Sequence, residues 1–235
     1  MIVLGLDSAT AACSAAIWQD GRILARRFEE MSRGQAEALV PMARAVVVEA
    51  GLRFTDLDRV GVTVGPGAFT GLRIGLAAAR GIALAAGADL IGITSLTAVA
   101  AAAFAEDAHP AGPLLVALET KRADLYVQLF AANQSAMTEP FVARAADLAA
   151  RLPGHPARIA GDGAQTALAA FAASASGLAA PALCIAGLPD AATVAALAAA
   201  RAETHVAPEP IYLRAPDVTP EPAGGKASRG AGGPG

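Results

Sequence analysis

The sequence predicts an α/β protein in which one unit of strands and helices occurs twice, giving two lobes. Three observations support this fold class. Short β-branched runs alternate with alanine-rich helical stretches along most of the chain. Residues 115–119 repeat the apolar run and the closing acidic residue of residues 3–7, and a second strand pattern follows each of them. Finally, 54% of the 235 residues are hydrophobic, which is sufficient for a large core.

The first lobe, residues 1–109, begins with a three-stranded meander whose hairpin signal is the polar turn at residues 19–22. A helix is expected from a capping box of Ser32 and Gln35 to about Ala50, where Gly51 ends it. The expected strands cover residues 2–6, 13–18, 22–28, 60–64 and 90–93, and the further helices cover residues 71–86 and 95–105.

The second lobe, residues 110–214, follows a turn rich in Pro and Gly and is a more alanine-rich copy of the first. Its last helix either belongs to this lobe or packs back on the first. The expected strands cover residues 115–119, 125–130, 140–143 and 157–160, and the helices cover residues 145–151, a stretch after Gly163, and residues 191–204. Residues 215–235 are mainly Pro, Gly and Ala, and they predict a disordered tail.

Charge and cysteine content exclude several classes of protein. Charged residues make up 17% of the chain and the net charge is -3, so no basic field exists that would hold a nucleic acid unaided. Cys13 and Cys184 lie far apart without CxxC spacing, which argues against a disulfide framework or a zinc site. The N-terminus lacks the positive region of a signal peptide, and the uncharged stretch between Asp162 and Asp190 predicts a helix, a loop and a short strand. We expect a soluble cytoplasmic protein.

The most distinctive stretch is residues 59–81. A β-branched run ends in a loop punctuated by Gly65, Pro66, Gly67 and Gly71, and an apolar helix follows with Thr70 as its expected N-cap. Free amides at a helix N-terminus can hold a phosphate. However, the loop lacks the Gly-Lys-Ser/Thr ending of a P-loop and the glycine spacing of a dinucleotide site, so these residues favour a structural turn over a phosphate cradle.

Residues 65–75, together with Asp7-Ser8-Ala9-Thr10 and Tyr212-Leu213-Arg214, resemble the TsaB family, also called YeaZ, over nearly the whole chain. The resemblance implies a duplicated fold like that of actin and Hsp70 (ASKHA, ribonuclease H-like). It also implies a catalytically silent subunit of the bacterial complex that installs threonylcarbamoyl on the tRNA adenosine beside the anticodon. The motif turn comprises Gly65, Pro66, Gly67, Phe69, Thr70 and Gly71.

The resemblance further implies a set of partners. The chain would pair, as a scaffold or activator, with the catalytic ATP-dependent paralogue TsaD, and the small P-loop ATPase TsaE would join the complex. tRNA would be bound only within that complex. No cofactor is expected on the isolated chain, because ATP and metal would belong to the catalytic partner.

Two predicted helices of the first lobe are apolar around most of their circumference. The charged residues of these two helices are only Glu37, Arg44, Glu49, Arg73 and Arg80. Such helices are usually covered on every side, so they are expected either to form a partner interface or to expose alanine at little cost. A homodimer through the same surface is a further alternative.

We predict that the partner-binding residues are Leu39, Met42, Ala43, Val46, Arg73, Leu76 and Arg80. Two neighbouring four-turn helices can supply an interface of standard size, on the order of 800 Å² per partner. Changing Ala43 to glutamate is expected to abolish pairing and to leave the monomer folded.

Residues for ATP chemistry are only partly present. Enzymes of the implied fold hold ATP between their lobes with glycine-rich turns, whereas Ala9 replaces a glycine in the first turn here and residues 119–124 contain none. Asp7 and Glu119 remain as vestigial acids of the cleft, and two such carboxylates can hold magnesium. The alternative function is therefore an ATP-dependent phosphotransferase or ATPase of the sugar-kinase-like class.

Histidine placement argues against peptidase chemistry, the activity behind the older glycoprotease label of the resembled family's catalytic relatives. His109, His155 and His205 lack metal-ligand spacing. The metal-bearing paralogue carries histidines on the helix equivalent to residues 35–50, which contain none here, and Gln35 stands where many relatives keep one. We therefore expect neither catalytic residues nor a metal site.

Overall fold

The computed structural model describes residues 1–107, 112–120, 122–174, 179–202 and 208–214, and it contains two five-stranded mixed sheets. The first sheet has the order β3-β2-β1-β4-β5, and the second has the order β10-β9-β6-β7-β8. The strands of the first sheet are β1 (Ile2–Asp7), β2 (Ala12–Gln19), β3 (Arg22–Glu30), β4 (Arg59–Thr63) and β5 (Asp89–Ile93). Those of the second are β6 (Leu114–Glu119), β7 (Asp124–Phe130), β8 (Phe141–Arg144), β9 (Arg158–Ala160) and β10 (Ala182–Leu183).

Six helices connect these strands in the described part of the chain. They are α1 (Gln35–Glu49), α2 (Phe69–Ala86), α3 (Ser95–Ala105), α4 (Leu148–Arg151), α5 (Ala164–Ala173) and α6 (Ala191–Ala200). Each half therefore runs through three strands and a helix, then a strand and a helix, and again a strand and a helix. In each sheet the first strand pairs antiparallel with the second and parallel with the fourth. The duplicated ASKHA-type α/β fold predicted from the sequence is confirmed.

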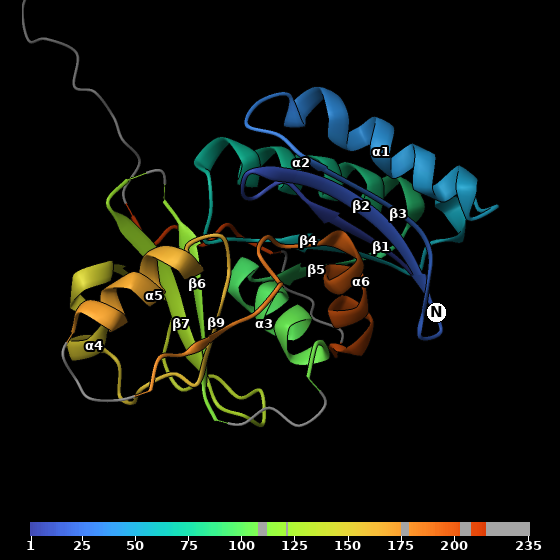
Figure 1. Cartoon of the computed structure of the whole chain (residues 1–235). Coiled ribbons are helices and arrows are strands. Elements are labelled where there is room, and N and C mark those ends of the chain that lie inside the picture. The colour runs from blue at the N-terminus through green and yellow to red at the C-terminus, as the bar shows by residue number, and fades with distance from the viewer. Residues whose placement is uncertain (108–111, 121, 175–178, 203–207, 215–235) are drawn as a thin grey trace, which may run out of the picture.

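The helices and sheets form successive layers (Figure 1). α1 and α2 cover the outer face of the first sheet, and α4 and α5 cover the outer face of the second. α3 and α6 lie between the sheets, and each crosses to the other half. α3 packs its Leu96 and Val99 against the second sheet, whereas α6 packs its Val194 and Ala198 against the first.

Close packing explains why the alanine-rich α6 is a buried helix. A Cβ atom at Gly5 of β1 would lie 2.0 Å from the carbonyl oxygen of Ala191, and one at Gly61 of β4 would lie 2.7 Å from the Cβ atom of Ala198. The helix therefore rests almost directly on the sheet backbone, which only glycine on the sheet and small residues on the helix allow.

A buried arginine fastens each crossing helix at its C-terminal end. Arg59, the first residue of β4, donates hydrogen bonds to the carbonyl oxygens of Ala198 (3.1 Å) and Arg201 (2.6 Å) at the end of α6. Arg158, the first residue of β9, donates to the carbonyl oxygen of Ala103 near the end of α3 (3.3 Å). A cation is favourable there because the helix dipole and the last free carbonyl groups are negative.

The sheet registers correct our alignment of the two halves by one residue. β4 pairs Arg59 with Val3, and β9 pairs Arg158 with Leu114. Val3 and Leu114 also both face a crossing helix. Val3 therefore corresponds to Leu114 and Asp7 to Leu118, whereas the sequence pattern matched residues 3–7 with residues 115–119. Side chains alternate along a strand, so a shift of one residue moves each of them to the opposite face.

The helix starts also differ from the predictions. α2 begins at Phe69 after Ala68, so Thr70 is inside the helix and is not its N-cap. α1 follows Gly34, which has no side chain to cap it, and the predicted capping box is wrong because the Gln35 amide donates to the carbonyl oxygen of Met31 instead. The uncharged stretch after Asp162 forms α5 and β10 as predicted. The predicted tail at residues 215–235 lies outside the described residues.

Within the described residues, α2 alone has the length and mean hydropathy of a helix that could cross a membrane. Burial inside the protein accounts for a third of this helix. Leu72, Leu76 and Ala79 are buried in the protein, and Gly75 packs against the Ser8 hydroxyl and Val62.

Candidate partner-binding face and inter-lobe cleft

The motif turn after β4 packs directly on the turn that follows β1. The Ala68 amide donates to the carbonyl oxygen of Ala9 (2.7 Å), and the Ser8 hydroxyl donates to the carbonyl oxygen of Gly71 (2.9 Å). A Cβ atom at Gly67 would lie 2.2 Å from the Ala9 oxygen, and one at Gly71 would lie 2.0 Å from the Ser8 oxygen. These glycines are therefore needed for contact between two turns of the same chain.

Asp7 is fully buried beneath this pair of turns. The Thr63 hydroxyl donates to Asp7 Oδ1 (2.6 Å), and the Ala9 amide donates to the same oxygen (3.2 Å). Among the described residues, Asp7 Oδ2 has no hydrogen-bond partner. Burial raises the pKa of Asp7 to about 7, and the charge of nearby Asp190 acts in the same direction. The carboxyl is thus closed off from solvent.

A small cleft of about 170 Å³ separates the two lobes. Its walls include Thr10 and Ala68 from the first half, and Glu119, Tyr126 and Asp162 from the second. The Glu119 amide donates to Asp162 Oδ1 (2.9 Å). Burial raises the pKa of Asp162 to about 6, with the neighbouring Glu119 charge adding to the effect.

The predicted pair of cleft acids is corrected by this geometry. Glu119 lines the cleft, but Asp7 is buried outside it, because the two residues are not equivalent in the repeat. The cleft is smaller in this conformation than pockets for drug-sized ligands, which hold roughly 300 Å³ or more, and the contact between Ala68 and Ala9 fills the space beside the first turn.

The described residues contain no group of three or more His, Cys, Asp or Glu side chains that could hold a metal ion. His155 packs edge-on against Phe171, with ring centroids 5.2 Å apart. His109 and His205 lie outside the described residues.

Five of the predicted partner-binding residues are buried inside the fold, which is a correction. They are Leu39, Met42, Ala43, Val46 and Leu76. All five belong to the core between α1, α2 and the first sheet. The sequence pattern identified a genuine apolar stripe but assigned it to the wrong contact, since the stripe covers the protein's own sheet. Because Ala43 has no exposed surface, we now expect Ala43→Glu to destabilise the monomer as well as to affect pairing.

The two predicted arginines of α2 make contacts within the chain. The Arg73 guanidinium lies 3.7 Å from the centre of the Phe69 ring and donates to the Tyr212 hydroxyl (3.3 Å). Arg80 donates to the carbonyl oxygen of Pro208 (2.7 Å). Both side chains therefore hold the segment that follows α6.

Other residues of the same helices expose apolar surface. Val40 and Val48 of α1 are 49% and 66% exposed, and Leu84 of α2 is 86% exposed. Val40, Arg44 and Val48 lie four residues apart and so form one row along α1. Sequence reasoning missed this row because it runs beside the buried stripe on a helix that is apolar on nearly all sides.

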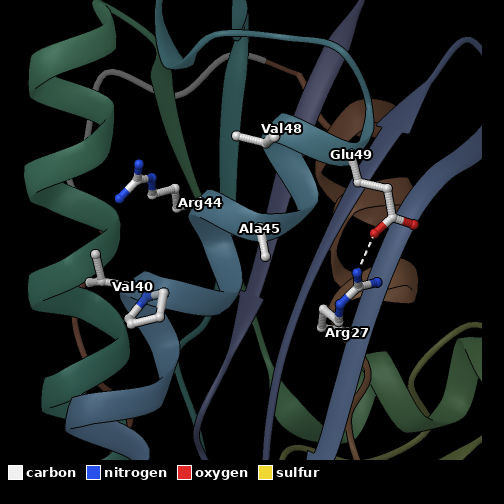
Figure 2. A pocket seen from close by; sticks show the side chains of 7 residues that line it. Arg27, Val40, Arg44, Ala45, Val48 and Glu49 are labelled. Carbon is white, nitrogen blue, oxygen red and sulfur yellow. Dashed lines mark ion pairs between the residues drawn. The ribbon is translucent and has the colours of Figure 1, made fainter.

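A hollow of about 690 Å³ lies along this row (Figure 2). It is lined by Arg27, Val40, Pro41, Arg44, Ala45, Val48 and Glu49. Figure 2 shows Val40 and Arg44 directed toward α2, while an ion pair between Arg27 of β3 and Glu49 bounds the opposite side. The resulting face combines the apolar side chains of α1 with Arg44 in the middle of the row and with the Arg27–Glu49 pair at one margin, and interfaces are often enriched in arginine.

Comparison with known proteins places these features in a family. The family model of TsaD, described as tRNA N6-adenosine threonylcarbamoyltransferase, matches residues 28–219. The Escherichia coli protein named tRNA threonylcarbamoyladenosine biosynthesis protein TsaB is 35% identical over 126 residues, which cover 54% of this chain and 53% of that protein. The match thus spans about half the length of this curated relative.

Two further similarities extend over the whole fold. An uncharacterized protein of Mycobacterium tuberculosis is 32% identical over 220 residues, covering 93% of this chain and 94% of that protein. The crystal structure of a Pseudomonas aeruginosa protein, described as uncharacterized and similar to peptidase YeaZ, superposes with a TM-score of 0.76 at 27% identity. The superposition covers 91% of this chain and 99% of that one.

Proposed function

The chain belongs to the TsaB (YeaZ) family, and from this premise we propose that it takes part in tRNA threonylcarbamoyladenosine biosynthesis as a non-catalytic cytoplasmic subunit. In this proposal it is a scaffold or activator that pairs with the catalytic, ATP-dependent paralogue TsaD. TsaE joins the resulting complex, and tRNA is bound only there.

The observation that carries the proposal is the exposed apolar surface of two helices, which comprises the row on α1 and Leu84 on α2. Val48 and Leu84 each expose more than half of their surface, although the chain has enough core to bury large side chains elsewhere. An exposed apolar surface rimmed by charge marks a protein contact more often than an accident of folding. Helices of 15 and 18 residues lying side by side can supply roughly the 800 Å² per partner of a standard interface.

The inter-lobe cleft supports a silent subunit. Asp7 is shielded from solvent, the cleft holds about 170 Å³, and the motif glycines bring two turns of the chain together. ATP and the metal therefore belong to the catalytic partner in this proposal, and the isolated chain needs neither.

Light scattering after size exclusion tests the pairing directly. The chain is mixed with the TsaD paralogue of the same genome, as wild type and as Val48→Glu and Leu84→Glu. We expect a one-to-one complex for the wild type and at least about tenfold weaker pairing for each variant, because a charge would be buried in an apolar contact. All three chains should remain folded, since both positions are exposed.

Ala169→Glu is the matched control, because Ala169 is an exposed residue of α5, the counterpart of α2 in the second half. It should pair as the wild type does. Wild-type pairing by Val48→Glu and Leu84→Glu would contradict the assigned face. If the chain alone forms a homodimer and these two variants reduce it to a monomer, the face binds a second copy of this chain instead.

Calorimetric titration of the isolated chain with Mg-ATP addresses the alternative, an ATP-dependent phosphotransferase or ATPase. The proposed role predicts no heat of binding. Saturable binding that Glu119→Gln weakens would instead support the enzyme, because Glu119 is an acid that lines the cleft.

A further inference from the structure

Residues 208–214 run from one lobe to the other along the rim of the cleft. They begin at α2, where Arg80 holds the Pro208 carbonyl (2.7 Å), and pass the end of β4, where the Ile211 amide donates to the Val64 carbonyl (2.7 Å). They end at Arg214, which forms an ion pair with Asp124, the first residue of β7 in the second sheet.

The first lobe is shaped to receive this segment. A Cβ atom at Gly65 would lie 2.7 Å from the Ile211 oxygen, and one at Gly92 would lie 2.9 Å from the Pro208 side chain. The Tyr212 ring packs on Phe69 with centroids 5.1 Å apart. Arg73 covers the same Phe69 ring and donates to the Tyr212 hydroxyl, so Phe69 and Arg73 of α2 both hold Tyr212.

The anchor in the second lobe is partly buried. The side chains of Arg214 and Asp124 are 29% and 16% exposed, so their attraction is screened less than that of a surface pair. The Thr120 hydroxyl donates to Asp124 Oδ1 (2.6 Å), which helps to hold the carboxylate in place.

The segment also borders the cleft. A cavity of about 150 Å³ beneath it is lined by Ile211, Tyr212 and Arg214 together with Gly67, Ala68, Thr120 and Tyr126. The latter four residues also line the inter-lobe cleft. Separation of the lobes at this rim would therefore require withdrawing Tyr212 from Phe69 or breaking the pair of Arg214 with Asp124.

We propose that residues 208–214 form a strap that holds the inter-lobe cleft closed and ties its opening to the position of α2. The strap adds a second connection between the two lobes, beside the one that the crossing helices α3 and α6 make. A displacement of α2 is transmitted through Arg73 and Arg80 to the strap, and from there to Asp124. This device needs no partner protein, so it is tested on the chain alone and stands apart from the pairing with TsaD.

Amide hydrogen exchange on the full chain measures how often the lobes separate at the strap. For Arg214→Asp and for Tyr212→Ala we expect at least about tenfold faster exchange in residues 64–71 and 124–128, because each variant removes one anchor of the strap. Adding Asp124→Arg to Arg214→Asp restores the ion pair in reverse and should recover part of the protection.

Arg53→Asp is the matched control, since Arg53 forms an ion pair with Asp56 and neither residue lines the cleft or the cavity beneath residues 208–214. It should leave both segments unchanged. The second control is a chain that ends after residue 214. This shorter chain keeps the strap, so its amides should exchange as those of the full chain do. Unchanged exchange in Arg214→Asp, or an equal rise across the whole chain, would overturn the proposal.

Discussion

The two lobes share one strand order but differ in the size of the elements on their outer faces. α1 and α2 have 15 and 18 residues, whereas their counterparts α4 and α5 have 4 and 10. The third strand shortens likewise, from 9 residues in β3 to 4 in β8. The common topology thus needs only short outer helices to cover a sheet.

The chemistry of the outer faces differs as well. The exposed residues of α5 include Gln165, Thr166 and Ala169, which are polar or small. The exposed residues of α1 and α2 include the large apolar side chains of Val40, Val48 and Leu84. In the first lobe the outer helices are longer than a sheet of this topology needs, and these same helices expose apolar surface. Both features support a binding role for α1 and α2 rather than for α4 and α5.

The largest expected difference between the lobes is in the free energy of unfolding when a glutamate is placed on an outer helix of each. Ala43→Glu buries a carboxylate between α1 and the first sheet and should lower the free energy of unfolding by at least about 4 kcal/mol. Ala169→Glu, on the exposed side of α5, should change it by less than about 0.5 kcal/mol. Urea denaturation followed by circular dichroism measures both, and a stable Ala43→Glu chain would refute the buried position of this stripe.

The next difference is in how stability depends on pH, and it compares Asp7 of the first lobe with Glu119 of the second. The pKa of Asp7 is about 7 in the folded chain and 3.8 in the unfolded chain, so the favourable protonated form is lost as pH rises from about 4 through 7. Asp7→Asn should therefore match the wild type near pH 4 and be more stable above pH 7, by up to about 4 kcal/mol. Glu119→Gln, at an exposed residue, should change stability little at either pH. A pH-independent gap between Asp7→Asn and the wild type would contradict a buried titrating carboxyl.

The smallest difference is in the stability lost when each of the two buried arginines, Arg59 and Arg158, is replaced. Arg59→Met leaves three carbonyl oxygens near the end of α6 without their donor and should cost about 2 to 4 kcal/mol. Arg158→Met removes one hydrogen bond together with two nitrogen atoms that have no partner among the described residues. That change should be nearly neutral, within about 1 kcal/mol. Thermal unfolding compares the variants, and equal losses would mean that the two crossing helices are fastened alike.

Much of the architecture follows from local signals in the sequence. Alternating β-branched runs, turn glycines and alanine-rich stretches predicted the order of strands and helices, and they did so even for the uncharged stretch that forms α5 and β10. The glycine pattern of residues 65–71 likewise indicated a tight turn. These features depend on neighbouring residues, which a sequence displays directly.

Three features were decided only by the tertiary structure. A helix as apolar as α1 has no face that the sequence marks as internal, so packing on the first sheet alone buries Leu39 and Ala43 and leaves Val40 and Val48 outside. Strand register is set by pairing across the sheet, and the sequence of one strand does not show it. The sequence pattern therefore matched Asp7 with Glu119, although the two side chains lie in different surroundings. The contacts of Arg73 and Arg80 with residues 208–212 join positions more than a hundred residues apart, and no local pattern can reveal them.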